Sequence, residues 1–133
     1  VLIPFEKGLL GHSDADVLVH AVIDALLGAA AAGDIGTHFP CTDELRGISS
    51  IELLKRTRKI ISRKGYDIAN IDSTVVMQQP RLAPYINGMR ANIAQALGVD
   101  LGAVSVKAKT TEGMGFEGRG EGASAMAAAT IIV

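Results

Sequence analysis

The sequence of 133 residues contains no tryptophan, a single cysteine, and aromatic side chains at only 4% of its positions. The lone Cys41 excludes an intramolecular disulfide. Hydrophobic residues still make up 48% of the chain, so a core must be built from closely packed alanine, valine, isoleucine and leucine. A chain of this length fits one domain, residues 1–133, which can bury about two-thirds of its unfolded surface.

The chain also has no large excess of positive or negative charge and no long hydrophobic run. The formal net charge of −1 gives no bulk attraction for nucleic acid, whose binding domains are usually strongly basic. The longest apolar stretch, residues 25–32, is far shorter than a membrane span. Since the first residues also lack the pattern of a secretory signal, we expect no membrane partner and a reducing location, either bacterial cytoplasm or a plastid or other organelle interior.

Hydrophobic periodicity predicts the order strand, helix, helix, strand, helix, strand, strand. The expected elements are a strand at Val1–Pro4, a helix over 14–32 with Ser13 and Asp16 as a capping box, a long loop over 34–48, a helix over 51–64 capped by Ser50, a strand over 67–78, a helix over 84–97 that Gly98 ends, and strands over 104–109 and 123–133. This order favours an α/β fold of the α+β kind. We expect a two-layer sandwich in which helices cover one face of a mixed four-stranded sheet.

Two polar clusters stand out in this apolar chain. One is His12–Asp16, and the other is Lys107–Glu112, which the glycine-rich loop of residues 113–122 follows. Polar residues concentrated in two distant segments, with flexible backbone beside one of them, indicate a single site built from both. We interpret this site as that of an enzyme for a phosphorylated substrate.

His12 and His20 are open to several interpretations. His20 shares a helix face with Asp16 and Asp24, which suits a metal ligand, an acid–base group or an ordinary core histidine. His12 is expected at the mouth of the same helix, where free backbone N–H groups favour a phosphate; a simple turn residue is the alternative.

The second cluster combines a cation, hydroxyl groups and a carboxylate at Lys109, Thr110, Thr111 and Glu112. That set suits a phosphate group together with Mg²⁺ or Mn²⁺. The loop that follows allows close backbone approach to a ligand, and Arg119 adds a fork of donors, although a solvated hairpin loop would look similar. Its glycine spacing matches neither the P-loop nor the dinucleotide-binding fingerprint.

Taken together, these stretches resemble the 2-C-methyl-D-erythritol 2,4-cyclodiphosphate synthase family of the non-mevalonate isoprenoid pathway. The resemblance rests on Glu6–Asp16 through His20, Asp24–Ala29, Gly33–Gly36, His38–Pro40, Thr42–Asp43, Lys107–Glu112 and Gly115–Gly122, in this order along the chain. It implies a homotrimer with active sites between neighbouring subunits. The implied reaction cyclises 4-diphosphocytidyl-2-C-methyl-D-erythritol 2-phosphate, with release of CMP and no covalent intermediate.

The same resemblance assigns roles to residues. His20 corresponds to a Zn²⁺ ligand, Glu112 to a ligand of the Mg²⁺ or Mn²⁺ on the diphosphate, and His12 and Thr110 to groups that stabilise the transition state. The implied substrate contacts are His12, Ser13, Asp34, Ile35, Gly36, Phe39, Pro40, Cys41, Thr42 and Asp43 for the methylerythritol phosphate, Met77, Gln78, Gln79, Pro80, Arg81, Leu82, Ala83, Lys109 and Thr110 for the cytidine, and Thr111, Glu112, Phe116 and Arg119 nearby.

Two departures from the family pattern keep other functions open. The Asp-x-His pair that supplies the other zinc ligands is absent from this sequence, which suggests an incompletely represented N-terminus. Cys41 replaces an aspartate, and a thiol does not accept a hydroxyl proton as a carboxylate does. The alternatives are a trimeric binding protein without catalysis and a metal-dependent nucleotide hydrolase.

Overall fold

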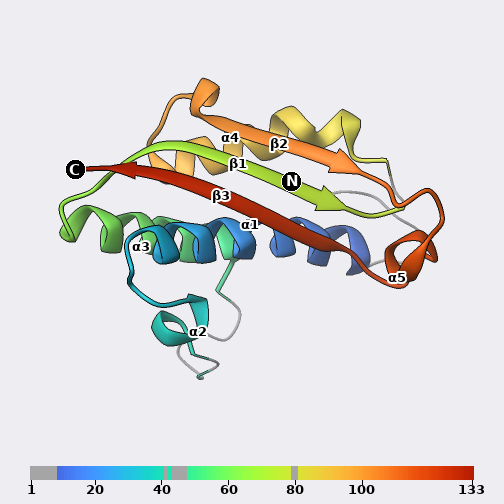
Figure 1. Ribbon diagram of the computed structural model, residues 1–133, viewed down its shortest axis with the longest axis horizontal. Helices are drawn as coiled ribbons and strands as arrows, with labels where there is room; N and C mark the ends of the chain where they lie inside the picture. Colours follow the sequence, from blue (N-terminus) through green and yellow to red (C-terminus); the bar gives the residue numbers. More distant parts are fainter. Residues whose placement is uncertain (1–8, 41, 43–47, 79–80) are drawn as a thin grey trace.

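The computed structural model describes residues 9–40, 42, 48–78 and 81–133, with the backbone alone for residues 9–16. Figure 1 shows the course of the chain. Its longer elements are α1 (Leu9–Ala29), α3 (Ser50–Arg63), β1 (Asp67–Val76), α4 (Ile86–Leu97), β2 (Val104–Lys109) and β3 (Ser124–Ile132), and its short turns are α2 (Ile35–His38), a 3₁₀ turn at Ala83–Tyr85, another at Leu101–Ala103, and α5 (Gly115–Gly118).

The sheet has the strand order β2-β1-β3. β1 pairs with β2 in parallel, from Ile71 beside Val104 to Val76 beside Lys109, and with β3 in antiparallel orientation. The predicted mixed sheet is therefore confirmed. Three strands lie within the described residues, and the fourth expected strand, Val1–Pro4, falls outside them.

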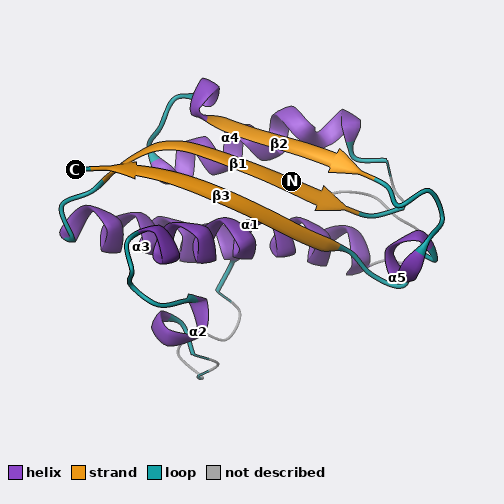
Figure 2. Ribbon diagram, viewed as in Figure 1, coloured by secondary structure: helices purple, strands orange, loops and turns teal. Residues whose placement is uncertain are grey.

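Helices cover one face of this sheet (Figure 2). α1 packs on β3 and β1, α4 packs on β2, and α3 lies against α1 and α4. In β1, Ile71, Ser73 and Val75 are buried, whereas the residues between them are partly exposed. The largest fully buried side chains are Leu18, Ile23, Leu26, Leu27, Leu54, Ile61, Ile71, Ile93, Leu97, Val22, Val75 and Val104. The two-layer sandwich and the aliphatic core are as predicted.

The opposite face of the sheet has no helix on it within the described residues. Along β3, Ala125, Ala127 and Ala129 pack toward the core, whereas Met126 is 66% exposed. On the same open face, Nζ of Lys107 lies 3.1 Å from Oδ1 of Asp72. A half-exposed ion pair of this kind stabilises the fold by about 0–1 kcal/mol. That is too little to explain by itself why this face of the sheet has no helix on it among the described residues.

The limits predicted for the first helix are wrong at both ends. α1 begins at Leu9, so Ser13 lies inside it and not at its N-cap position, and His12 lies within the helix and not at its mouth. Leu9 and Leu10 are good helix formers, which favours a helix that begins before Ser13. The helix ends at Ala29, four residues before the predicted Gly33, because Ala31 adopts φ +53° and the Ala32 N–H donates to the Leu27 carbonyl at 2.8 Å.

Three smaller predictions also need correction. Ser49, one residue before the predicted Ser50, caps α3 through its hydroxyl, which accepts the Glu52 N–H at 3.2 Å. The expected loops contain the single turns α2 and α5. A turn of four residues is shorter than the window in which helical periodicity can be recognised, so hydrogen bonding and not pattern defines it.

No helix in the described part of the chain is long and apolar enough to cross a membrane.

Candidate active site

The parallel pairing of β1 and β2 brings their carboxyl ends to one edge of the sheet. The Met77 amide donates to the Lys109 carbonyl at 3.0 Å, which extends the pairing one residue beyond β1. Next along the chain, Gln78 Oε1 accepts the Gly113 N–H at 3.2 Å. The stretch predicted to bind the cytidine therefore begins beside Lys109. Among them, Gln79 and Pro80 lie outside the described residues, Leu82 is buried, and Arg81 and Ala83 are exposed.

A tight turn follows β2 and presents Glu112. The Glu112 amide donates to Thr110 Oγ1 at 3.4 Å, and the Thr111 hydroxyl donates to the Met114 carbonyl. Glu112 itself adopts φ +57°, a left-handed conformation that costs a residue with a side chain about 1–2 kcal/mol. Its exposed carboxylate forms no ion pair with any described residue, so it is free to receive a cation.

The glycine-rich loop folds closely on itself at Gly118. A Cβ atom on Gly118 would lie 2.2 Å from the carbonyl carbon of Gly113, so no larger residue fits there without movement. Gly118 N–H also donates to the Met114 carbonyl at 3.1 Å, which closes α5. A Cβ atom on Gly122 would touch the Phe116 ring at 3.4 Å, and that ring is 45% exposed. The loop thus holds an aromatic side chain at the surface.

Charged side chains at the end of this loop are already paired. Arg119 Nε lies 2.6 Å from Glu121 Oε1, and both side chains are more than half exposed. The bond to Glu121 raises the pKa of the Arg119 guanidinium. Glu117 Oε2 accepts the Ser124 hydroxyl at 2.9 Å and so ties the loop to the start of β3. The predicted contact residue Arg119 can meet an anion only at the exposed side of this pair.

The second polar region, which we call the Asp34 segment (residues 33–40), depends on side-chain hydrogen bonds. Asp34 Oδ1 accepts both the Thr37 amide, at 2.9 Å, and the Thr37 hydroxyl, at 2.8 Å, and thereby caps α2. These bonds lower the pKa of the Asp34 carboxyl below its ordinary value. His38 Nε2 lies 2.6 Å from the Ala32 carbonyl, which closes the turn.

Asp24 has a role that the sequence did not indicate. Its Oδ1 accepts the Ile35 N–H at 2.7 Å and joins the first residue of α2 to α1. Asp24, noted in the sequence only as sharing a helix face with His20, therefore has an anchoring role. A bond across eleven residues between a helix and a loop has no local sequence signal, because the spacing of Asp24 and His20 is equally typical of a shared helix face.

His20 is exposed on α1, and no group of three candidate metal ligands occurs among the described residues. The side chains of His12 and Ser13 are outside the description, as are Cys41 and Asp43. Thr42 is exposed, and its amide donates to the Pro40 carbonyl at 2.8 Å. Phe39 packs partly on the core, whereas Gly36 and Pro40 are exposed.

Within one chain, the Asp34 segment and the glycine-rich loop lie apart. Figure 1 shows α2 below α1 and α3, and α5 near the opposite end of the long axis, beyond the carboxyl end of β1. The structure therefore brings the start of the stretch that is predicted to bind cytidine to Lys109 and Thr110. It does not bring the Asp34 segment to them.

Comparison with known proteins adds to this geometry. The model of the YgbB family matches residues 1–132. The chain belongs to the YgbB family. It is 61% identical over 133 residues to 2-C-methyl-D-erythritol 2,4-cyclodiphosphate synthase of Alkaliphilus oremlandii, covering 99% of this chain and 85% of that protein. It is 58% identical over 132 residues to the protein of the same name from Desulforamulus reducens, with 98% and 84% covered.

Solved structures of YgbB-type proteins share the fold. The bifunctional IspDF from Campylobacter jejuni superposes with a TM-score of 0.83 at 40% identity, covering 86% of this chain and 31% of that one. The CDP complex of IspF from Plasmodium falciparum gives 0.77 at 33% identity, with 87% and 70% covered. The resemblance recognised in the sequence is thus confirmed at the level of the family and of the α+β fold.

Proposed function

We propose that this chain is an enzyme that converts 4-diphosphocytidyl-2-C-methyl-D-erythritol 2-phosphate into 2-C-methyl-D-erythritol 2,4-cyclodiphosphate and CMP. The observation that carries the proposal is the family match over residues 1–132, together with relatives of that name at about 60% identity. The chemistry makes the enzyme a phosphorus–oxygen lyase of non-mevalonate isoprenoid biosynthesis.

In this reaction an oxygen of the 2-phosphate attacks the β-phosphorus of the same molecule. The bond between that phosphorus and the oxygen bridging to the α-phosphorus breaks, and CMP leaves with the electron pair. Since both reacting groups belong to one substrate, the protein contributes positioning and charge stabilisation. No covalent intermediate with the chain is needed.

The edge formed by β1 and β2 supplies the groups for the diphosphate. Lys109 is an exposed cation, and the Thr110 hydroxyl stands beside the backbone turn at Glu112. We assign Thr110, together with His12, to the charge that develops on the transferring phosphoryl group. We assign Met77 and Gln78 to the cytidine; their position directly after β1 and beside Lys109 supports this assignment. A cytidine diphosphate bound to the related Plasmodium protein supports a pocket for this nucleotide.

Two metal roles accompany this assignment. The exposed Glu112 carboxylate suits Mg²⁺ or Mn²⁺, which prefer oxygen ligands and would offset charge on the diphosphate. The exposed His20 imidazole offers one ligand for Zn²⁺, a metal that needs three or four. The described residues hold no group of three ligands, so no step is assigned to zinc.

We further propose a homotrimer in which each active site lies between neighbouring subunits. The separation of the Asp34 segment from the edge at Lys109 supports it, since one chain presents each half without the other (Figure 1). The open sheet face, where Met126 and Ile132 of β3 are exposed, offers an apolar interior for such an assembly.

The activity is tested by phosphorus NMR of protein, cytidyl substrate, Zn²⁺ and Mg²⁺, repeated with chelator. Metal-dependent formation of the cyclic diphosphate with CMP supports the proposal. An unchanged substrate spectrum from folded protein overturns it and favours a non-catalytic binding protein.

The shared site is tested by mixing two inactive variants, Asp34→Ala and Lys109→Ala. If each site combines two subunits, random mixed trimers regain about a quarter of the wild-type activity, because one arrangement in four is intact. No recovery from a mixture shown to have exchanged subunits would place the whole site in one chain.

A further inference from the structure

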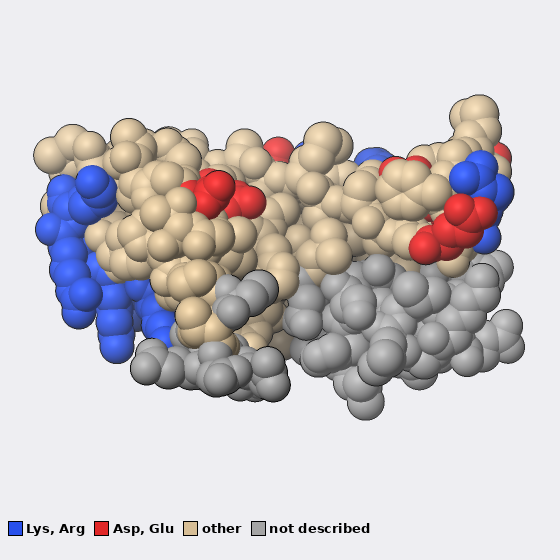
Figure 3. Space-filling view, turned by 90° about the horizontal axis from the view of Figure 1, so that it is seen from below, with Lys and Arg blue, Asp and Glu red and all other residues tan. Residues whose placement is uncertain are grey.

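Positive charge is concentrated on α3, away from the candidate active site. Six of the 13 lysines and arginines of the chain fall between residues 55 and 64, namely Lys55, Arg56, Arg58, Lys59, Arg63 and Lys64, and all six are exposed. Figure 3 shows Lys and Arg gathered at one end of the molecule. The net charge of the chain is −1, so this helix is a local exception.

A groove of about 490 Å³ runs between α3 and α4 along this surface. Its lining includes four cations, Lys55, Arg58, Lys59 and Arg63, together with the polar Ser62 and Gln95. The one carboxylate in the lining, Glu52, lies 3.7 Å from Arg56, which is a fifth cation outside the groove. The groove therefore has a strong excess of positive charge.

Three of these cations form a row on one stripe of the helix. Lys55, Lys59 and Arg63 follow each other at intervals of four residues, one helical turn apart. Like charges at this spacing destabilise a helix, and none of the three forms an ion pair with any described residue. The unfavourable spacing is relieved when an anion lies along the row.

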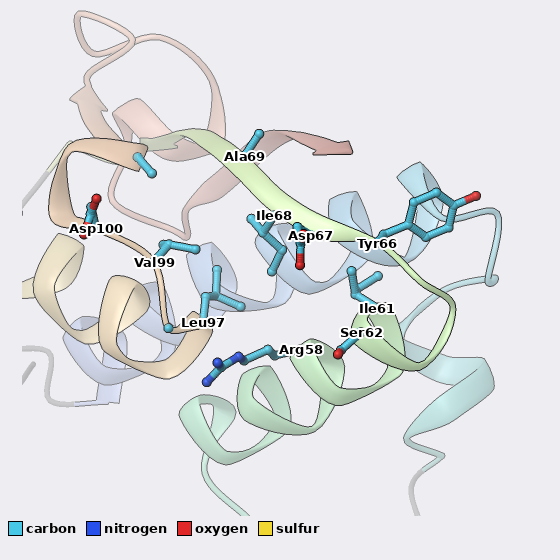
Figure 4. Close-up of a pocket in the computed structure, with 12 residues that line it drawn as sticks. Arg58, Ile61, Ser62, Tyr66, Asp67, Ile68, Ala69, Leu97, Val99 and Asp100 are labelled. Carbon is cyan, nitrogen blue, oxygen red and sulfur yellow. The ribbon is translucent and has the colours of Figure 1, made fainter. Parts of the chain in front are cut away.

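Arg58 is held in place from the other side of the groove. A Cβ atom on Gly98 would lie 2.4 Å from the guanidinium carbon, so Arg58 rests directly on the residue that ends α4. The carboxyl end of a helix attracts a cation, so the end of α4 is a favourable place for this guanidinium. Figure 4 shows Arg58 reaching from α3 toward Leu97 of α4.

A second cavity of about 440 Å³ continues from the first and shares Arg58 and Ser62 with it. Its floor is aliphatic, with Ile61, Ile68 and Leu97, and Asp67 and Asp100 supply carboxylate acceptors for hydroxyl or amino groups (Figure 4). The combined groove offers cations at one end and a mixed apolar and hydrogen-bonding compartment at the other.

From this geometry we infer that the groove between α3 and α4 is a binding site for a small molecule with a polyphosphate group. The phosphates lie along Lys55, Lys59 and Arg63, and Arg58 stands at the junction of the two cavities. A volume of a few hundred Å³ is that of a small-ligand pocket, whereas a nucleic-acid duplex needs a wider basic surface. The site is separate from the edge of Lys109 and Thr110.

The test is a titration of the full chain with tripolyphosphate, followed by backbone amide NMR. Saturable shifts are expected at residues 55–63 and 95–98, distinct from any shifts at the proposed diphosphate site around residues 109–112. Lys55→Gln/Lys59→Gln weakens this binding by about tenfold, since two charge-assisted contacts are lost. The matched control Lys64→Gln removes a charge of the same helix outside the groove and leaves the affinity within about twofold. Lys59→Arg keeps the binding.

Three outcomes would overturn the inference: no saturable shift in folded protein, an equal loss in the Lys64→Gln control, or tighter competition by duplex DNA than by tripolyphosphate. ATP serves as a second probe. Additional shifts at residues 66–69 and 99–103 would show that its nucleoside occupies the second cavity, which distinguishes a nucleotide ligand from a polyphosphate alone. Lys109→Gln can change shifts only at the proposed diphosphate site and leaves those of the groove and the second cavity in place, so the failure of one proposal is distinguishable from the failure of the other.

Discussion

The Asp34 segment and the glycine-rich loop are both polar, exposed and short of regular structure, yet they are held by different means. In the Asp34 segment, carboxylates accept backbone N–H groups, from Asp24 to Ile35 and from Asp34 to Thr37. In the glycine-rich loop, backbone lies against backbone, with Gly118 over Gly113. The first region should therefore be sensitive to loss of a side-chain acceptor, and the second to an atom added at Gly118.

The largest effect is expected for Gly118→Ala. The new Cβ would lie 2.2 Å from a Gly113 backbone atom, so the loop must open. We expect an unfolding free energy lower by about 1–3 kcal/mol, and CMP release slower by about 100-fold, because the groups beside the loop are displaced. Thermal unfolding and a CMP assay measure both. Gly102→Ala is the control, since a Cβ there meets nothing within 4 Å. Wild-type activity in Gly118→Ala would refute backbone contact as the organising feature.

Asp24→Ala should have the next largest effect. It removes the acceptor for the Ile35 amide and frees α2 from α1. We expect KM for the cytidyl substrate to rise by roughly three- to tenfold, since such a bond contributes about 0.5–1.5 kcal/mol. Faster hydrogen exchange at the Ile35 amide reports the same loss directly. Asp24→Asn retains an oxygen acceptor and should behave like wild type; equal defects in both variants would point to charge and not to anchoring.

Arg119→Gln distinguishes support of the glycine-rich loop from contact with substrate. The pair with Glu121 is 2.6 Å long but more than half exposed, so its loss should change the unfolding free energy by no more than about 0.5 kcal/mol. Turnover should fall if Arg119 meets the substrate as proposed. Chemical denaturation and steady-state kinetics give the two numbers. A large loss of stability would show that side chains hold this loop as well.

The smallest effect concerns pH. Hydrogen bonds from Thr37 lower the pKa of Asp34 below its ordinary value of 3.8. A lowered pKa in the folded state means that the cap is fully formed above pH 3.8 and is lost only as the pH falls through the lower folded value. NMR titration of the Thr37 amide should show a midpoint below 3.8. Thr37→Val removes the hydroxyl donor and should move the midpoint up toward 3.8; an unmoved midpoint would exclude that hydroxyl as the cause.

The comparison also separates what was predictable in each region. The hydrophobic pattern predicted the ends of five elements to within two residues, because alternation or helical spacing persists through each of them. These elements are β1, β2, β3, α3 and α4. It missed α2 and α5, which are single turns, and placed the start of α1 five residues late. The motifs Lys107–Glu112 and Gly115–Gly122 marked the glycine-rich region of the site by residue type alone.

The sequence by itself determined the family, the aliphatic core and the residue types available for phosphate chemistry, because these depend on composition and on motifs that are continuous along the chain. Only the tertiary structure decided that Gln78 meets Gly113, that Asp24 anchors α2, and that Arg58 rests on Gly98 in a basic groove. Those contacts join residues 11 to 40 positions apart, and their formation depends on how the helices and the sheet pack together, which no local pattern encodes.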